Sequence, residues 1–152
     1  MLDLTNLTRH SVSRLFFERL TQQFWRVLKR RPRLISLVLV DDKKMRELNF
    51  VYRKKNKVTD VLSFNYHSDK SQPDDANFFG EIVICLPQAA RQAPLFWPTA
   101  KRVGQGKTPA ALLKLELARL FNHGLLHLAG YDHKKPAEAK IMFALADKLT
   151  YV

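Results

Sequence analysis

The first half of the chain alternates between helical and strand patterns. Apolar residues recur every three or four positions over residues 11–31, which predicts an amphipathic helix that Pro32 ends. Residues 33–40, RLISLVLV, are rich in leucine and β-branched side chains and predict a strand buried on both faces. Residues 41–53 return to a helical period. The shared face of this second helix consists of Met45, Leu48 and Tyr52.

The middle of the chain predicts two more strands and little regular structure between them. DVLSFNY at residues 60–66 and GEIVICLP at residues 80–87 have β character, and a polar loop is expected at residues 67–78. A short helix is predicted at residues 87–93. Three prolines and two glycines at residues 94–109 then predict a loop.

The third segment carries the most apolar helix of the chain. Residues 110–128 are apolar on nearly all sides, which predicts a central, buried helix. Gly130 is suited to end it in the left-handed conformation, and Pro136 is suited to the first turn of a last helix. The residues of this last helix expected to dock inward are Ile141, Met142, Leu145 and Leu149.

The order of elements is helix, strand, helix, strand, strand, helix, helix, helix. It predicts an α+β fold in which a small mixed β-sheet packs against helices, and the length suits one domain spanning residues 1–152. The longest apolar strand run is too short to cross a membrane, and the N-terminus lacks the apolar run of a signal peptide. Cys85 is the only cysteine, which excludes an internal disulfide and fits a reducing compartment. We therefore expect a soluble, cytoplasmic protein without a membrane partner.

The charge balance points to an anionic partner. The chain has 26 Lys and Arg against 14 Asp and Glu, a formal net charge of +12. Such a surplus in a small domain favours nucleic acid over a membrane, although a solubilising surface is the alternative.

Three histidines provide the candidate chemistry. His123 and His127 are four residues apart, so a helix places both imidazoles on one face, one turn apart. His133 follows after Gly130, completing the pattern His-x-x-x-His-x-x-Gly-x-x-His. Three neutral imidazoles can bind one metal ion and leave a fourth position for water, and zinc is the first expectation.

The residues around the histidines narrow the reaction class. Zinc peptidases of this spacing carry a glutamate after the first histidine as general base, whereas this chain has Gly124 there, which disfavours proteolysis. Asp132 is either a residue that orients a ligand's second ring nitrogen or a turn residue. Glu116 lies two helical turns before His123 and is expected either to support the site or to pair with an arginine or lysine.

A basic segment joins the second helix to the next strand. Arg53, Lys54, Lys55 and Lys57 lie within LNFVYRKKNKVTDVLSF, residues 48–64, and are either phosphate contacts or a solvated loop. A second basic cluster ends the first helix and is either an RNA-facing patch or a complement to the helix dipole.

Together, LNFVYRKKNKVTDVLSF, GEIVICLPQAARQA and ELARLFNHGLLHLAGYDH resemble the YbeY family of bacterial metal-dependent endoribonucleases and ribosomal RNA maturation factors. The resemblance implies that His123, His127 and His133 bind one Zn²⁺ and that Arg53 is the catalytic or phosphate-contacting residue. The chain differs from the family pattern at residues 54–58, where Lys54-Lys55-Asn56-Lys57-Val58 replaces a Gly-Lys-Asp followed by proline. It also differs at Glu81, where aspartate is common.

The function implied by the resemblance is single-strand-preferring RNA cleavage in 16S rRNA 3′-end maturation and small-subunit ribosome biogenesis and quality control. A zinc-bound water would be the nucleophile and Arg53 would contact the phosphate. The implied partners are the small ribosomal subunit, ribosomal proteins and assembly GTPases. The alternative hypothesis is a non-catalytic, RNA-binding assembly factor with a structural metal site; a peptidase is a third, weakened by Gly124.

Overall fold

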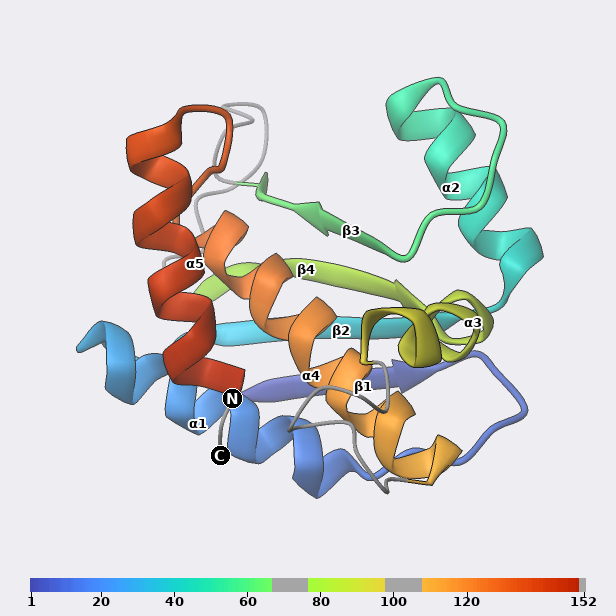
Figure 1. The fold of residues 1–152 in the computed structure, drawn as a ribbon, viewed down its shortest axis with the longest axis horizontal. Helices are drawn as coiled ribbons and strands as arrows, with labels where there is room; N and C mark the ends of the chain where they lie inside the picture. Colours follow the sequence, from blue (N-terminus) through green and yellow to red (C-terminus); the bar gives the residue numbers. More distant parts are fainter. Residues whose placement is uncertain (67–76, 98–107, 151–152) are drawn as a thin grey trace.

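A four-stranded mixed β-sheet forms the centre of the molecule (Figure 1). The computed structural model describes residues 1–66, 77–97 and 108–150. The strands are β1 (Leu2–Asn6), β2 (Leu34–Val40), β3 (Val61–Phe64) and β4 (Phe78–Cys85), in the spatial order β1-β2-β4-β3. β1, β2 and β4 are parallel, whereas β3 pairs with β4 in the antiparallel direction and forms one edge. The predicted α+β class with a mixed sheet is confirmed.

The alternation of side chains gives the sheet two different faces. Ile35, Leu37 and Leu39 of β2 are fully buried in the main core, together with residues of α1, α4 and α5. Val40, Val83 and Cys85 point to the opposite face, where they pack with Met45 of α2. The prediction that β2 is buried on both faces therefore holds only in part, because Ser36 and Val38 are half-buried.

Helix α4 (Pro109–Leu128) is the central helix of the main core, as its composition predicted. Thr108 caps it by accepting a hydrogen bond from the backbone N–H of Ala111, and Pro109 occupies its first turn. The helix lies across the sheet and is flanked by the other helices of that layer (Figure 1). The flanking helices are α1 (Arg14–Leu28), α3 (Leu86–Phe96) and α5 (Pro136–Thr150).

Helix α2 (Asp42–Arg53) determines where the basic segment begins. Asp41 is its N-cap and accepts a hydrogen bond from the backbone N–H of Lys44 at 2.9 Å. The helix ends at Arg53 because Lys54 adopts the left-handed conformation, with φ of 60°. Of the predicted shared face, Met45 is fully buried, but Tyr52 is 60% exposed and packs its ring against Phe64.

The sequence-based expectations were wrong at three points. β1 was not predicted, because five residues with only two leucines give a weak strand signal. Helix α3 continues through Pro94 to Phe96 although a loop was predicted there; proline near the end of a helix removes only one hydrogen bond. Ile141 is 56% exposed, whereas its neighbour Met142 is buried with Leu149. Of the predicted loops at residues 67–78 and 94–109, residues 67–76 and 98–107 lie outside the described residues, and Phe78 already belongs to β4.

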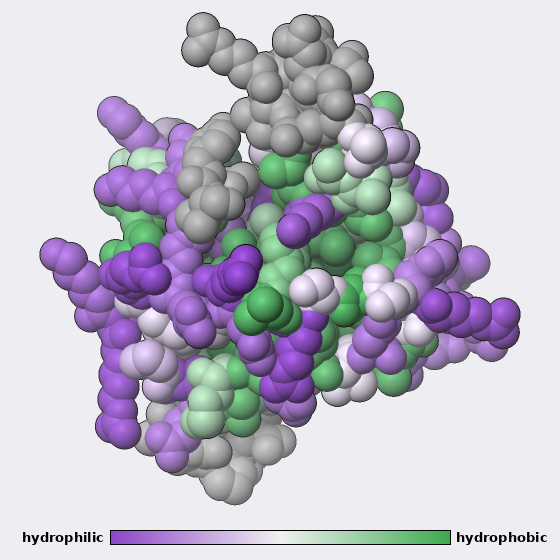
Figure 2. Space-filling model, turned by 90° about the horizontal axis from the view of Figure 1, so that it is seen from below, coloured by the Kyte–Doolittle hydropathy of each residue, from purple (hydrophilic) through white to green (hydrophobic). Residues whose placement is uncertain are grey.

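The surface combines charged side chains with apolar areas. Figure 2 shows extended hydrophilic side chains around the rim of one face, with hydrophobic residues between them. Within the described ranges, no helix has both the length and the apolar character needed to cross a bilayer.

Candidate metal centre

His123 and His127 lie on the last two turns of α4. Their Nε2 atoms are 3.0 Å apart and their ring centroids 4.5 Å apart. Two ring nitrogens this close cannot both carry a proton, so at least one lone pair points between the rings. The i,i+4 spacing therefore places both imidazoles on one helical face, where they could share a metal ion.

The turn after α4 brings His133 back to the first two histidines. Gly130 has φ of 98°, a conformation that favours glycine, and its N–H donates to the carbonyl oxygen of His127 at 3.0 Å. The N–H of Tyr131 donates to Leu126, also at 3.0 Å, which closes the helix end. One ring nitrogen from each of the three histidines then lies within 4.8 Å of the other two.

A backbone carbonyl fixes the tautomer of His127. Its Nδ1 lies 3.1 Å from the carbonyl oxygen of Tyr131. Because a carbonyl oxygen can only accept, the proton of the neutral ring is on Nδ1, and Nε2 presents a lone pair to the other histidines. An orienting partner on the second nitrogen is the usual arrangement for a histidine that binds metal.

The two histidines on α4, His123 and His127, are held in the neutral form that metal binding requires. Burial, reinforced by the neighbouring His127 and His133, lowers the pKa of His123 to about 4. Burial and His133 also lower the pKa of His127, against an opposing effect of the Tyr131 carbonyl. At neutral pH these imidazoles therefore have free lone pairs without first losing a proton.

Gly124 lies between the histidines because the helix approaches the sheet closely there. A Cβ atom at this position would lie 3.1 to 3.2 Å from three side-chain atoms of Ile82, which is fully buried on β4. The glutamate that zinc peptidases carry at this position would meet the same strand. The packing thus gives a steric reason, beyond the missing carboxylate, why this site is not built for peptidase chemistry.

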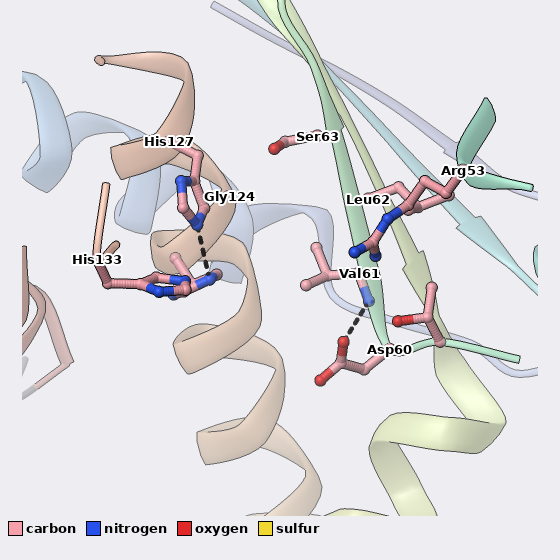
Figure 3. A pocket seen from close by; sticks show the side chains of 10 residues that line it. Arg53, Asp60, Val61, Leu62, Ser63, Gly124, His127 and His133 are labelled. Atoms are coloured by element: carbon pink, nitrogen blue, oxygen red, sulfur yellow. Dashed lines mark hydrogen bonds between the residues drawn. The ribbon is translucent and has the colours of Figure 1, made fainter. Parts of the chain in front are cut away.

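The histidines form one wall of a pocket of about 400 Å³. The opposite wall comes from β3 and the segment before it, residues 59–63, with Arg53 at the end of α2. Figure 3 shows the Arg53 guanidinium and the Asp60 side chain on the β3 side and His127 and His133 across from them. The structure therefore brings Arg53 and the three histidines together in one pocket.

Comparison with known proteins agrees with this arrangement. The family model described as "Endoribonuclease YbeY" matches residues 4–151. The chain belongs to the YbeY family. Proteins named "Endoribonuclease YbeY" are 43% identical over 115 residues in Myxococcus xanthus and 36% identical over 139 residues in Sulfurihydrogenibium. These alignments cover 76% and 91% of this chain, but 35% and 82% of the respective relatives.

A YbeY relative from Thermodesulfovibrio yellowstonii is 40% identical over 121 residues, which is 76% of this chain and 64% of that protein. The chain thus spans only about a third of the Myxococcus relative, and just under two thirds of this one. The solution structure of TM1509 from Thermotoga maritima is similar to the fold, with a TM-score of 0.61 and 25% identity. That similarity covers 99% of this chain and 87% of TM1509.

Two predicted residues lie beside the YbeY-family site rather than in its pocket lining. Asp132 accepts a hydrogen bond from the backbone N–H of His133 at 2.7 Å, which lowers the pKa of its carboxyl group. Glu116 is fully buried on α4 and accepts hydrogen bonds from Gln92, Trp97 and Arg119. The ion pair with Arg119 is the arginine pairing that the sequence analysis gave as one of the two roles for Glu116.

The three lysines lie on the loop that leaves the site. Lys54, Lys55 and Lys57 are exposed and are outside the lining of the pocket. The buried side chain of Asn49 anchors this loop by donating to the carbonyl oxygen of Lys57 at 2.8 Å. The basic segment is therefore tied to α2 at Lys57 and lies next to Arg53 on the outside of the pocket.

Asp60 also lines the pocket and was not predicted as a site residue. A single aspartate before a strand carries no spacing signal. One of its side-chain partners, Gln92 on α3, lies far away in the chain.

Proposed function

We propose that this chain is a metal-dependent endoribonuclease that hydrolyses phosphodiester bonds in single-stranded RNA, with residues 1–152 acting as a single domain. The observation that carries the proposal is one pocket with three clustered imidazoles on one wall and an arginine on the other. The relatives named as endoribonucleases and the net charge of +12 support an RNA substrate.

The residues present fit a single Zn²⁺. Three imidazole nitrogens within 4.8 Å, two lowered pKa values and a fixed His127 tautomer match the ligand chemistry of an open zinc site. His123, His127 and His133 would hold the ion. When bound, it would supply a Lewis acid that lowers the pKa of water and polarises a phosphoryl oxygen.

Arg53 supplies positive charge on the side of the pocket opposite the histidines. Its planar guanidinium can bind two phosphate oxygens at once and neutralise the charge that builds on the phosphoryl group during hydrolysis. The ridge of Lys54, Lys55 and Lys57 would hold neighbouring phosphates of the same strand, so binding would depend strongly on salt concentration.

The biological role that fits this chemistry is rRNA processing. We place the protein in the cytoplasm, acting on the 3′ end of 16S rRNA during small-subunit biogenesis and quality control. Ribosomal proteins and assembly GTPases are the protein partners. Membership of the YbeY family and the basic surface support this assignment.

Cleavage of defined RNAs tests the proposal. A single-stranded RNA that carries the 16S 3′ end should be cleaved by purified protein, and the same sequence in a duplex should be cleaved much more slowly. Chelation should stop cleavage and added Zn²⁺ should restore it. His127→Ala protein, purified in parallel, reports contaminating nuclease. RNA binding without cleavage in any arm would instead favour an assembly factor with a structural metal.

A further inference from the structure

Asp60 is a half-buried carboxylate that lines the same pocket as the histidines and Arg53. Its backbone is fixed at the start of β3, where its carbonyl oxygen accepts the N–H of Cys85 at 2.8 Å. Its Oδ1 accepts the backbone N–H of Val61 at 2.7 Å, as drawn in Figure 3. The carboxylate is therefore held in one orientation at the pocket wall.

A glutamine behind the pocket holds the second oxygen. Gln92 Nε2 on α3 donates to Asp60 Oδ2 at 2.9 Å and to Glu116 Oε1 at 2.7 Å. An amide nitrogen has two hydrogens, so these bonds use its full donor capacity. Gln88 donates to the amide oxygen of Gln92 at 3.3 Å, which fixes which way the amide faces. The network thus positions Asp60 from outside the pocket.

The contacts of Asp60 leave it able to accept a proton. A carboxylate has about four lone-pair positions, and the two hydrogen bonds to Val61 and Gln92 use two of them. The charged or titratable groups that share the pocket lining with it are Arg53 on α2 and His123, His127 and His133 on the opposite wall. Asp60 and His123 interact electrostatically, with Asp60 favouring the protonated form of His123.

The other described carboxylates near the site have different roles. Glu116 is fully buried, and Trp97, Gln92 and Arg119 all donate to it. Asp132 lies outside the pocket lining and caps the backbone N–H of His133. Among the residues that the structure describes, Asp60 is the carboxylate in the pocket lining.

We infer that Asp60 is the general base of the hydrolysis and that Gln92 is its positioning residue; this inference rests on the proposed ribonuclease function. The oxygen of the attacking water forms a bond to phosphorus while one of its protons passes to the Asp60 carboxylate. The bond between phosphorus and the leaving ribose oxygen breaks. The proton held by Asp60 then passes to that leaving oxygen, directly or through a water molecule, which gives the ribose hydroxyl and restores the carboxylate.

The test compares Asp60→Asn with Asp60→Glu under single-turnover conditions at saturating RNA. The asparagine keeps the oxygen that accepts from Val61 but cannot take a proton. We expect Asp60→Asn to lower the cleavage rate by about 10²- to 10⁴-fold. Asp60→Glu keeps a carboxylate that can take up a proton. It should therefore cleave RNA at least about ten times faster than Asp60→Asn. Asp147→Asn, an exposed aspartate on α5, is the matched control and should cleave at the wild-type rate.

Two readouts separate a base from a structural residue. Asp60→Asn should bind one zinc per chain, like the wild type. It should also bind RNA as tightly as the wild type, both with and without the metal. Gln92→Met should lower the rate constant for cleavage without changing RNA affinity, because it releases the carboxylate rather than the substrate.

The outcomes distinguish this inference from the proposed function. If wild-type protein cleaves RNA and Asp60→Asn cleaves within threefold of it, Asp60 is not the base and the ribonuclease assignment stands. Loss of zinc or RNA binding in Asp60→Asn would also overturn the inference, since Asp60 would then be a structural residue. If the wild-type protein itself does not cleave RNA, the proposed function fails first.

Discussion

The two walls of the pocket differ in charge and in construction. The histidine wall consists of the imidazoles of His123, His127 and His133, which come from α4 and the turn after it. Burial lowers the pKa of His123 and His127. The β3 wall, Arg53 and residues 59–63, contains a guanidinium and a carboxylate and is assembled from α2, β3 and the loop between them. One wall is suited to hold a cation and the other to hold a phosphate and move a proton.

This difference predicts that metal binding and catalysis can be separated by mutation. Substitutions on the histidine wall should remove the ion and with it the reaction. Substitutions on the β3 wall should leave the ion in place and slow the reaction. Glu116 on α4 is connected to Asp60 on the β3 wall because Gln92 donates a hydrogen bond to both. Substituting Glu116 should therefore destabilise the whole fold rather than change one wall alone.

His127→Ala should have the largest effect. It removes the imidazole whose tautomer the Tyr131 carbonyl fixes, so the remaining two ligands should not retain zinc, and cleavage should fall to background. Elemental analysis of the variant, alongside its RNA affinity, checks this. Zinc retained at one ion per chain would show that His127 is not a ligand.

Glu116→Ala should come next, as a loss of stability. It leaves the buried donors of Trp97 and Gln92 without their acceptor and Arg119 without its counterion, so the free energy of unfolding should fall by about 3–5 kcal/mol. Urea denaturation measures it. Glu18→Ala breaks an exposed pair with Arg14 and, as the control, should cost about 0.5 kcal/mol or less.

Arg53→Ala should slow cleavage without removing the metal. Loss of one group that stabilises transition-state charge typically lowers the rate by about 10²- to 10³-fold. Arg53→Lys should recover only part of that loss, because an ammonium cannot bind two phosphate oxygens in a plane. Zinc content equal to wild type in both variants would support the separation of the walls; zinc loss would contradict it.

Lowering the pH should reduce the free energy of unfolding of the metal-free protein, because the fold lowers the pKa of His123. The pKa of His123 is about 4 in the fold, compared with 6.5 for an unperturbed histidine. Between these values the unfolded chain takes up the proton and the folded chain does not, so stability should fall as the pH drops from 6.5 towards 4. Urea denaturation at pH 7 and pH 5 measures this fall. It should be smaller in His123→Gln, and an equal fall would assign it to other groups.

Gly124→Ala should have the smallest effect. The new Cβ would lie 3.1 Å from Ile82 and strain the packing, while alanine gains about 1 kcal/mol over glycine in helix propensity. Overpacking of this kind costs about 1–3 kcal/mol, so we expect a net loss of about 1 kcal/mol in unfolding free energy. Adding Ile82→Ala removes all three crowding atoms of Ile82, so Gly124→Ala should cost less in that background. An equal cost in both backgrounds would show that Ile82 does not limit the position.

The histidine wall was predictable because its information is local. The spacing of His123 and His127 sets their relative position on any helix, and Gly130 signals the turn that returns His133. The buried character of α4 was likewise evident from its composition. By contrast, the periodicity of α5 did not distinguish Ile141 from Met142, because both lie near the boundary of the apolar face and packing decides between them.

The β3 wall was predictable only through the family resemblance, and then only at Arg53. Asp60 is fixed by Gln92 and lies opposite His123, residues 32 and 63 positions away in the chain, and no periodicity connects them. The same holds for β1, whose place beside β2 depends on pairing rather than on its own five residues. Such long-range contacts are set by the assembled fold.

The close packing at Gly124 also limits how this scaffold can evolve. A glutamate between the two helical histidines would introduce the proton-transfer group of a zinc peptidase, but its Cβ would lie against Ile82. A lineage that made this single substitution would therefore first carry a less stable protein, until Ile82 on β4 shifted or changed. Two proteins with the same three histidines can thus keep different reaction classes because a strand packs beneath the helix in one of them. The ligands themselves need not differ.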